Sequence, residues 1–203
     1  MWKIQGFSTL SPPSLSGRAF LTLCQETLYT YSEIERTCAF SGHRPQKLPW
    51  RYNEASPACI ALKEVLKGQI AQLVDAGMVH FLSGMAEATD TWSAEIVLLL
   101  REQNPTVKLH CILPCITQAD KWSVSSRQRY FSILDQADSI IRVNRAYRKG
   151  CMLERNYFMI RHASTLLAVY NGEYRGGTAA TVHYAQKMGR KILVIDPITL
   201  RIT

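Results

Sequence analysis

Glycines and polar side chains stand together where this chain could hold an anion. The clearest place is Arg175–Thr178, which reads RGGT, follows Asn171 and Gly172, and precedes a stretch with helical character. Paired glycines let a backbone turn tightly and approach a ligand closely. The unpaired amides of a first helical turn and the helix dipole favour an anion there. The loop is neither GxGxxG nor a Walker loop, so a plain turn between a strand and a helix is the alternative interpretation.

A second loop places charged side chains directly after Gly42. His43 carries an imidazole that can donate or move a proton near neutral pH. Arg44 carries a guanidinium that can bind a phosphate through two parallel hydrogen bonds. A solvated pair in front of a proline is the alternative.

A third loop begins with Ser83 and Gly84 and leads to Asp90 and Glu95. Asp90 can cap a helix or accept a hydrogen bond from a ribose hydroxyl. Arg155, in ERNYFMIRH, is either a ligand contact or part of a basic surface. The residues predicted to bind a ligand are Gly42, His43, Arg44, Ser83, Gly84, Asp90, Gly172, Gly176, Gly177 and Thr178.

The apolar pattern predicts a scaffold that brings these loops together. Unbroken apolar runs predict strands within residues 37–42, 78–84, 107–114, 139–143, 165–172 and 191–197. Helical spacing predicts helices within residues 56–77, 89–104, 125–137, 151–163 and 178–189. This alternation is typical of a Rossmann-like, doubly wound α/β fold, a mostly parallel six-stranded sheet with helices on both faces. Loops that follow its strands lie along one edge, where ligands bind.

Length and composition favour one domain with an addition at its N-terminus. Of the 203 residues, 37–203 carry the regular pattern. Residues 1–36 are predicted to be an extension, flexible at SPPSLSG and helical or flexible over RAFLTLCQETLYTYSEIER, without an assigned function. The N-terminus lacks a basic start and an apolar centre, so we expect a cytoplasmic protein. No apolar run has the length needed to span a membrane.

The net charge and the cysteines limit the kinds of ligand that we expect this protein to bind. The net charge is +8, and the stretch from Lys121 to Arg161 holds nine Lys or Arg against three Asp or Glu. A basic face suits a nucleotide, a phosphate or a nucleic acid, unless it is only a solvated surface. The six cysteines contain no CxxC pair and no His cluster beside them, so we expect reduced, packed thiols and no metal site.

Five segments in order resemble one family. FSGHRP, SGMAEATDTWSAE, ERNYFMI, LLAVYNG and RGGTAATVHYA are similar to the YpsA-like branch of the SLOG superfamily, which includes the DNA-processing protein DprA and the LOG phosphoribohydrolases. The resemblance covers roughly residues 37–197 and implies a Rossmann-like fold with a pocket for a nucleotide-derived ligand. It also implies a bacterial protein with a role in stress response or signalling.

The chain departs from that family at a few positions. The branch often has glycine where Ala88 stands, and aspartates near the positions of Arg161 and Ser164. The LOG hydrolases combine an arginine in R-K-x-x-M with a glutamate in PGGxGTxxE. Arg155 and Met159 match the first motif, with Asn156 for lysine, but His183 replaces the glutamate. Since a carboxylate stabilises the transition state of glycoside cleavage, the resemblance implies binding with poor hydrolysis.

Three functions follow. The first is a sensor or regulator that binds a nucleotide-derived ligand without efficient catalysis and without a required cofactor. The second is an N-glycoside hydrolase of nucleoside monophosphates, with catalytic candidates Arg155, Asp90, Glu95 and His43, and His183 as a substitute base.

The third function is DprA-like binding of single-stranded nucleic acid through bases stacked on aromatic rings. The aromatic residues concerned are Trp122, Tyr130, Phe131, Tyr147 and Tyr157. A homo-oligomer is a further partner that the sequence leaves open, and no membrane partner is expected.

Overall fold

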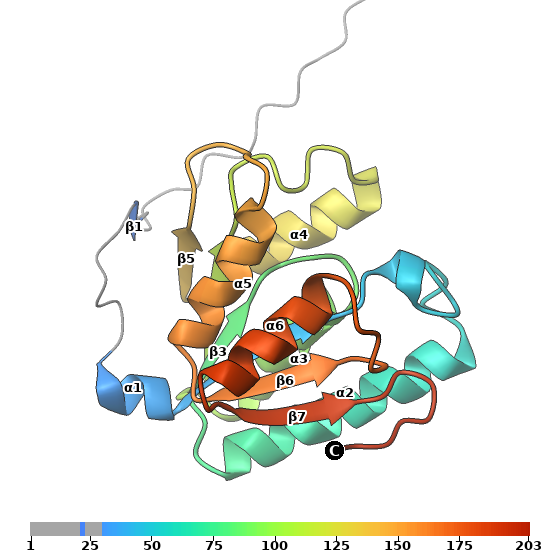
Figure 1. Cartoon of the computed structure of the whole chain (residues 1–203), viewed down its shortest axis with the longest axis horizontal. Helices are drawn as coiled ribbons and strands as arrows, with labels where there is room; N and C mark the ends of the chain where they lie inside the picture. The colour runs from blue at the N-terminus through green and yellow to red at the C-terminus, as the bar shows by residue number, and fades with distance from the viewer. Residues whose placement is uncertain (1–20, 23–29) are drawn as a thin grey trace, which may run out of the picture.

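The strands of the computed structural model form one parallel sheet (Figure 1). The structure describes residues 21–22 and 30–203. The strands are β1 (Leu21–Thr22), β2 (Thr37–Gly42), β3 (His80–Ser83), β4 (Lys108–Leu113), β5 (Ser139–Arg142), β6 (Thr165–Val169) and β7 (Lys191–Ile195). Their order is β1-β5-β4-β3-β2-β6-β7, with every neighbouring pair parallel. The six predicted strands are therefore confirmed, and the two-residue β1 adds an edge that the sequence pattern did not predict.

Helices cover both faces of this sheet, as predicted. They are α1 (Tyr31–Glu35), the 3₁₀ turn η1 (Pro45–Lys47), α2 (Pro57–Asp75), α3 (Thr89–Gln103), α4 (Val124–Gln136), α5 (Cys151–Arg161) and α6 (Gly177–Lys187). Figure 1 looks onto α5 and α6, in front of the sheet, with α2 and α3 behind it. Two layers of helices explain why strands such as β2 and β6 are largely apolar and buried on both sides.

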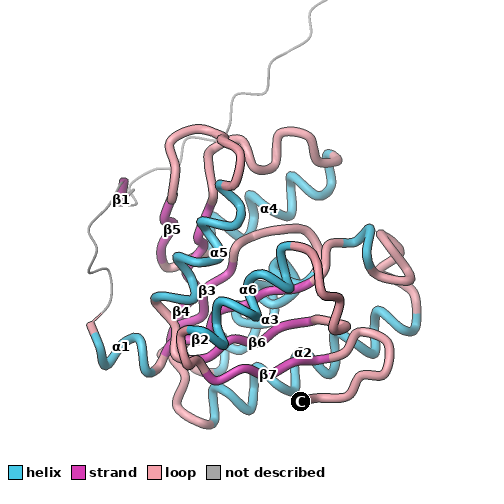
Figure 2. Tube along the Cα trace, in the orientation of Figure 1, coloured by secondary structure: helices cyan, strands magenta, loops and turns pink. Residues whose placement is uncertain are grey.

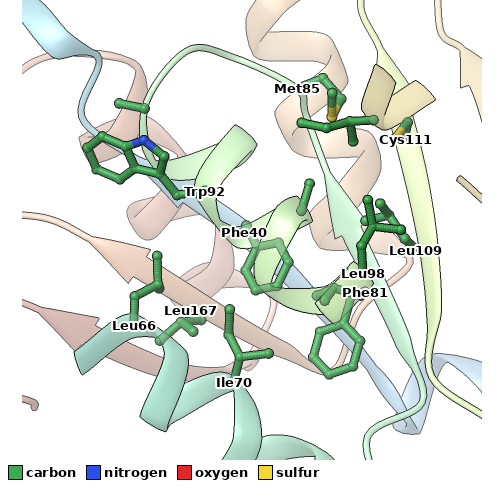
Figure 3. Packing of buried hydrophobic residues seen from close by; sticks show 14 of the residues in the cluster. Phe40, Leu66, Ile70, Phe81, Met85, Trp92, Leu98, Leu109, Cys111 and Leu167 are labelled. Atoms are coloured by element: carbon green, nitrogen blue, oxygen red, sulfur yellow. The ribbon is translucent and has the colours of Figure 1, made fainter. Parts of the chain in front are cut away.

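The larger core lies between the sheet and helices α2, α3 and α4. Phe40 and Phe81, from neighbouring strands, stack with ring centroids 5.8 Å apart, and Trp92 of α3 is 2% exposed (Figure 3). Helix α2 contributes a stripe at three- and four-residue spacing that includes Leu66 and Ile70. The smaller core packs α5 and α6 on the opposite face, around Ile112, Met159 and Leu166. This packing fixes both helices relative to the carboxyl ends of the strands.

The order of the strands reverses between β2 and β6. From β2 the chain adds strands in one direction, to β3, β4 and β5, and then crosses over through α5 to β6 on the other side. Ligands bind to such sheets at this switch point, outside the carboxyl ends of the strands. The loops after β2, β3 and β6 meet there and are drawn in pink in Figure 2.

Most of the predicted N-terminal extension lies outside the described residues, namely 1–20 and 23–29. Its described part forms β1, which pairs with β5, and α1. Thr30 caps α1 and makes a capping box with Glu33. The division of the chain at residue 36 therefore stays a proposal.

The described cysteines are buried and free, and Cys24 lies outside the described residues. Nowhere in residues 21–22 and 30–203 do three or more His, Cys, Asp or Glu side chains gather as they would to hold a metal ion. The same residues contain no helix that is long and apolar enough to cross a bilayer.

Two histidines meet at the amino ends of β3 and β4. His80 Nδ1 lies 3.0 Å from His110 Nε2, and His110 Nδ1 lies 2.7 Å from Ser139 Oγ. Burial lowers the pKa of His110 to about 4, and the neighbouring His80 acts in the same direction. Asp138 and Glu33 oppose this shift but are outweighed. Burial also lowers the pKa of His80. Both rings are therefore neutral at pH 7.

This pair predicts acid sensitivity. Because the folded-state pKa of His110 is depressed, the unfolded chain binds more protons between about pH 6.5 and 4. The free energy of unfolding is therefore highest above pH 6.5, where His110 is neutral in both states. It falls by about 2–3 kcal/mol as the pH drops towards 4. Urea unfolding at a series of pH values measures it. His110→Gln should flatten the dependence in this window, and an unchanged slope in the variant would contradict the assignment.

Candidate functional site

The loop between β6 and α6 ends in a helix N-terminus with open amides. Gly176 precedes α6 with φ 121° and ψ 174°, a conformation that only glycine adopts without strain. The first helical hydrogen bond runs from Ala180 N–H to Gly176 O. The amides of residues 177–179 thus have no partner among the described residues. A Cβ on Gly177 would have no atom within 4 Å, so this residue faces open space.

Arg155 of α5 is a buried cation with most of its donors free. Its side chain is 3% exposed, and its Nη1 lies 3.4 Å from Asp90 Oδ2. Its Nε is buried without a hydrogen-bond partner in the described part of the chain. A guanidinium can donate five hydrogen bonds, and this one makes a single long bond. Such an arginine is prepared to bind an anion that enters from the cavity.

The partner of that arginine, Asp90, also accepts a hydrogen bond of 3.3 Å from Ala86 N–H. Burial raises the pKa of Asp90, and the charge of Arg155 opposes that shift. Burial lowers the pKa of Arg155, and Asp90 opposes it. Desolvation therefore disfavours the charged form of both groups, as is usual for a buried ion pair with few additional hydrogen bonds.

Gly84 makes room for this arrangement. A Cβ at Gly84 would lie 1.3 Å from Arg155 Nη1 and 2.7 Å from Asp90 Oδ2. Ser83 shapes the same loop, because its hydroxyl donates to Asp90 O and accepts from Met85 N–H. Gly84 thus lies against the guanidinium and Ser83 holds the loop, and neither residue lines the cavity.

Two cross-links tie the loop after β2 to the loop after β6. His43 Nε2 lies 2.7 Å from Asn171 Oδ1, and Lys47 forms an ion pair with Glu173. Arg44, by contrast, is exposed, and its guanidinium makes no hydrogen bond or ion pair within the described residues. The loops are thus held side by side.

Together these elements enclose a cavity of about 580 Å³. Four basic side chains and one carboxylate line it, which gives it a positive potential suited to an anion. The charged residues are Arg44, Lys47, Arg155, Arg175 and Asp90. The remaining lining residues include Ser41, Gly42, His43, Gln46, Ala86, Gly150, Met152, Leu153, Asn156, Gly176, Gly177, Thr178 and Ala180.

The structure brings most of the predicted site residues together here, but it places four of them elsewhere. Gly84 lies against the guanidinium of Arg155, and Ser83 bonds to the backbone of Met85 and Asp90, as described above. Gly172 lies outside the lining, with φ 82° in the turn after β6. Glu95 points to α4, where both its oxygens bind the guanidinium of Arg129. Gly42 lines the cavity and also allows close packing, since a Cβ there would come within 2.3 Å of Thr89 Oγ1.

His183, which the family comparison suggested as a substitute base, is exposed. It packs edge-on against Tyr174, with ring centroids 6.0 Å apart, and is not part of the cavity lining. Asn156, in place of a lysine, donates to Thr181 Oγ1 at 2.7 Å and so steadies the start of α6.

Sequence reasoning missed Lys47 and the start of α5, where Gly150, Met152 and Leu153 line the cavity. The available signal was the position of α5 after β5, because that helix crosses over to the switch point. Lys47 gave no such signal, since it stands in a polar loop without regular pattern.

Comparison with known proteins agrees with this geometry. Residues 38–200 match the family model YpsA, described as the YspA SLOG family. A UPF0398 protein of Bacillus pumilus is 29% identical over 150 residues, which cover 73% of this chain and 80% of that protein. A UPF0398 protein of Bacillus thuringiensis is 28% identical over 156 residues, covering 76% and 84%.

Two solved structures of DprA share the fold. The Streptococcus pneumoniae protein aligns with a TM-score of 0.54 and 14% identity over 82% of this chain and 54% of its own. The Helicobacter pylori protein, described with a single-stranded DNA binding mode, aligns with a TM-score of 0.54 and 16% identity over 79% and 65%. This chain thus spans about half to two thirds of those proteins.

A double-mutant cycle tests the packing of Arg155 over Gly84. Gly84→Ala should cost about 1–3 kcal/mol of unfolding free energy, because its methyl group overlaps the buried guanidinium. In an Arg155→Ala background the same change should cost at least about 1 kcal/mol less, since the guanidinium is gone and only the close contact with Asp90 Oδ2 remains. Chemical denaturation of the four proteins measures the coupling. Equal costs in both backgrounds would contradict the contact.

Proposed function

The chain belongs to the YpsA family of SLOG proteins, and from that premise we propose that its cavity binds a phosphorylated, nucleotide-derived ligand in a sensing or regulatory role. The observation that carries the proposal is Arg155, a buried guanidinium with free donors. It lines the same cavity as the open amides at the start of α6. Arginine side chains bind phosphate through two parallel hydrogen bonds, and helix N-termini bind it through free amides.

The remaining lining suits the rest of a nucleotide. A volume of about 580 Å³ falls in the range of small-molecule sites. Met152, Leu153 and Ala180 offer apolar surface for a base, and Thr178 offers a hydroxyl at the first turn of α6. Arg44 and Arg175 add charge at the entrance. The proposed binding of a nucleotide-derived ligand by these residues requires no additional cofactor or metal ion.

The proposal is for binding and not for cleavage of the N-glycosidic bond. Of the described residues that line the cavity, Asp90 is the one carboxylate, and it faces Arg155 and the amide of Ala86. Glu95 is held by Arg129, and His183 lies outside. A hydrolase needs a carboxylate or base that reaches the sugar or the attacking water, and Asp90 would first have to give up its contacts.

Single-stranded nucleic acid is a second candidate, supported by the shared fold with the Helicobacter pylori protein. The aromatic residues support it less. Tyr130 is buried, and Tyr157 stacks on Tyr184 at 4.2 Å. Phe131 and Tyr147 are exposed, and Trp122 packs edge-on against Tyr130. Tyr130 and Tyr157 are therefore not free to stack a base, so only part of the predicted aromatic set supports this candidate.

Gly177→Asp tests the phosphate cradle, with Gly177→Asn as its matched control. Since nothing lies near the added Cβ and a carboxylate at a helix N-terminus is favourable, both variants should fold as stably as wild type. The carboxylate should abolish ligand binding by repulsion, while the neutral amide of nearly equal size retains part of it. Thermal-shift measurements with nucleoside mono-, di- and triphosphates provide the readout.

A ligand present at about 100 times its Kd adds roughly 2.7 kcal/mol, which raises Tm by about 5–10 °C in a domain of this size. A shift that persists in Gly177→Asp would refute the cradle. The same mixtures should contain no free base after incubation, and release of base that Arg155→Ala stops would favour the hydrolase.

Salt dependence separates the two candidates. Binding of a mononucleotide should weaken only slightly between 50 and 200 mM salt, because few charges are neutralised. Binding of a labelled oligo-dT would weaken steeply, with a log–log slope of about −0.7 for each phosphate contacted. Fluorescence anisotropy measures both ligands. Oligo-dT binding with a steep slope and no mononucleotide binding would favour the second candidate.

A further inference from the structure

A second cavity, of about 700 Å³, opens on the other side of the loop 84–88. The loop after β2, the start of α3, the segment before α4 and α4 itself enclose it. Its walls therefore belong to the α3 and α4 face of the sheet, whereas α5 and α6 form the first cavity. Ala86 lines the first cavity, and Glu87 and Ala88 line the second. Arg44 and Gln46, from the loop after β2, line both cavities. The two cavities therefore adjoin each other between this loop and the loop 84–88.

The floor of the second cavity is a closed ionic network. Glu54 accepts hydrogen bonds of 2.8 Å from Trp92 Nε1 and 2.6 Å from Arg129, and it pairs with Lys63. Burial opposes the ionisation of Glu54, but these donors outweigh burial and lower its pKa to about 2. Arg129 also binds Glu95. These charges neutralise one another and leave little net field.

Three cations at the rim stay unneutralised. Arg44, Arg51 and Lys121 are exposed, and their charged side chains make no hydrogen bond or ion pair within the described residues. Glu87 is the single acidic side chain in the described lining apart from Glu54. The cavity therefore carries a positive potential of its own, independent of Arg155 and α6.

Aromatic rings stand beside those cations. Trp122 is held edge-on against buried Tyr130, with centroids 5.4 Å apart, and so offers a rigid ring to the cavity. Tyr52 is 58% exposed, and its hydroxyl is bonded to Gln46. A flat ring next to free cations suits a nucleobase that carries phosphate, because the base stacks and the phosphate pairs.

We propose that the second cavity takes a second nucleoside phosphate, so that the ligand of this protein has two ends: two nucleosides joined through a chain of phosphates. Arg44, which lines both cavities and has no acidic partner, would hold the phosphates between them. This inference rests on the proposed function and names its ligand class. A ligand with both ends gains affinity over either half, because the second contact becomes intramolecular.

Lys121→Glu tests the second cavity, with Arg127→Glu as the matched control. Both residues are exposed and close in sequence, and both changes alter the charge equally, but Arg127 lines neither cavity. The probes for calorimetry are AMP and GMP as single-ended ligands, and diadenosine and diguanosine tetraphosphate as two-ended ligands. Wild type should bind one of the two-ended ligands about tenfold or more tightly than its mononucleotide.

Lys121→Glu should remove most of that gain and leave the mononucleotide affinity of the first cavity unchanged, while Arg127→Glu should keep the gain. Equal affinities for both probe types in wild type, or a gain that Lys121→Glu leaves intact, would overturn the inference but not the proposed function. Two-ended binding that survives Gly177→Asp and is lost in Lys121→Glu would refute the first cradle instead. Binding of oligo-dT that depends on Lys121, without tetraphosphate binding, would assign the second cavity to nucleic acid and overturn the proposal.

Discussion

The buried pair of Arg155 and Asp90 is the constraint around which this edge of the sheet is organised. A guanidinium that is 3% exposed has lost nearly all its hydration, and one long bond to Asp90 does not replace it. The guanidinium is nevertheless buried, because α5 crosses the sheet at the switch point and places Arg155 there. An anion that supplies the missing acceptors would relieve the desolvation, so the unfavourable term in the free protein becomes a source of affinity.

The position of Arg155 constrains the conformation of the loop 84–88. Gly84 lies under the guanidinium, and Met85 and Ala88 have positive φ values of 56° and 74°. Such conformations cost non-glycine residues about 1–3 kcal/mol each and persist where the surroundings determine them. In this loop, hydrogen bonds from neighbouring side chains hold the backbone in these conformations. Gln118 donates to the carbonyls of Gly84 and Met85, while Asp90 binds the amide of Ala86. The loop is therefore held in one shape between the two cavities.

The sequence predicted the scaffold well and the side-chain pairing poorly, for a physical reason. Unbroken apolar runs report burial on both faces of a sheet, and this property is local to each strand, so all six longer strands were predictable. The position of the glycine loop before α6 was predictable for the same reason. The partner of Glu95 was not, because Arg129 lies on the next helix and the pairing depends on how α3 and α4 pack. The role of Gly84 was equally hidden, since only the three-dimensional course of α5 brings Arg155 over it. The two-residue β1 is too short for any periodicity.

The positions at which the sequence resemblance implied a departure from the family separate by place in the fold. Arg161 is exposed at the end of α5, and the hydroxyl of Ser164 binds Glu35 O before β6 begins. Both lie towards the amino ends of the strands, opposite the cavities, so their change in charge does not alter the lining. Ala88 is different, because it lines the second cavity in a conformation that favours glycine. Its methyl group adds volume to the wall of the second cavity without adding charge. If ligand preference differs from that of relatives with glycine at this position, the difference should therefore arise in the second cavity, while the arginine and the helix N-terminus of the first remain as they are.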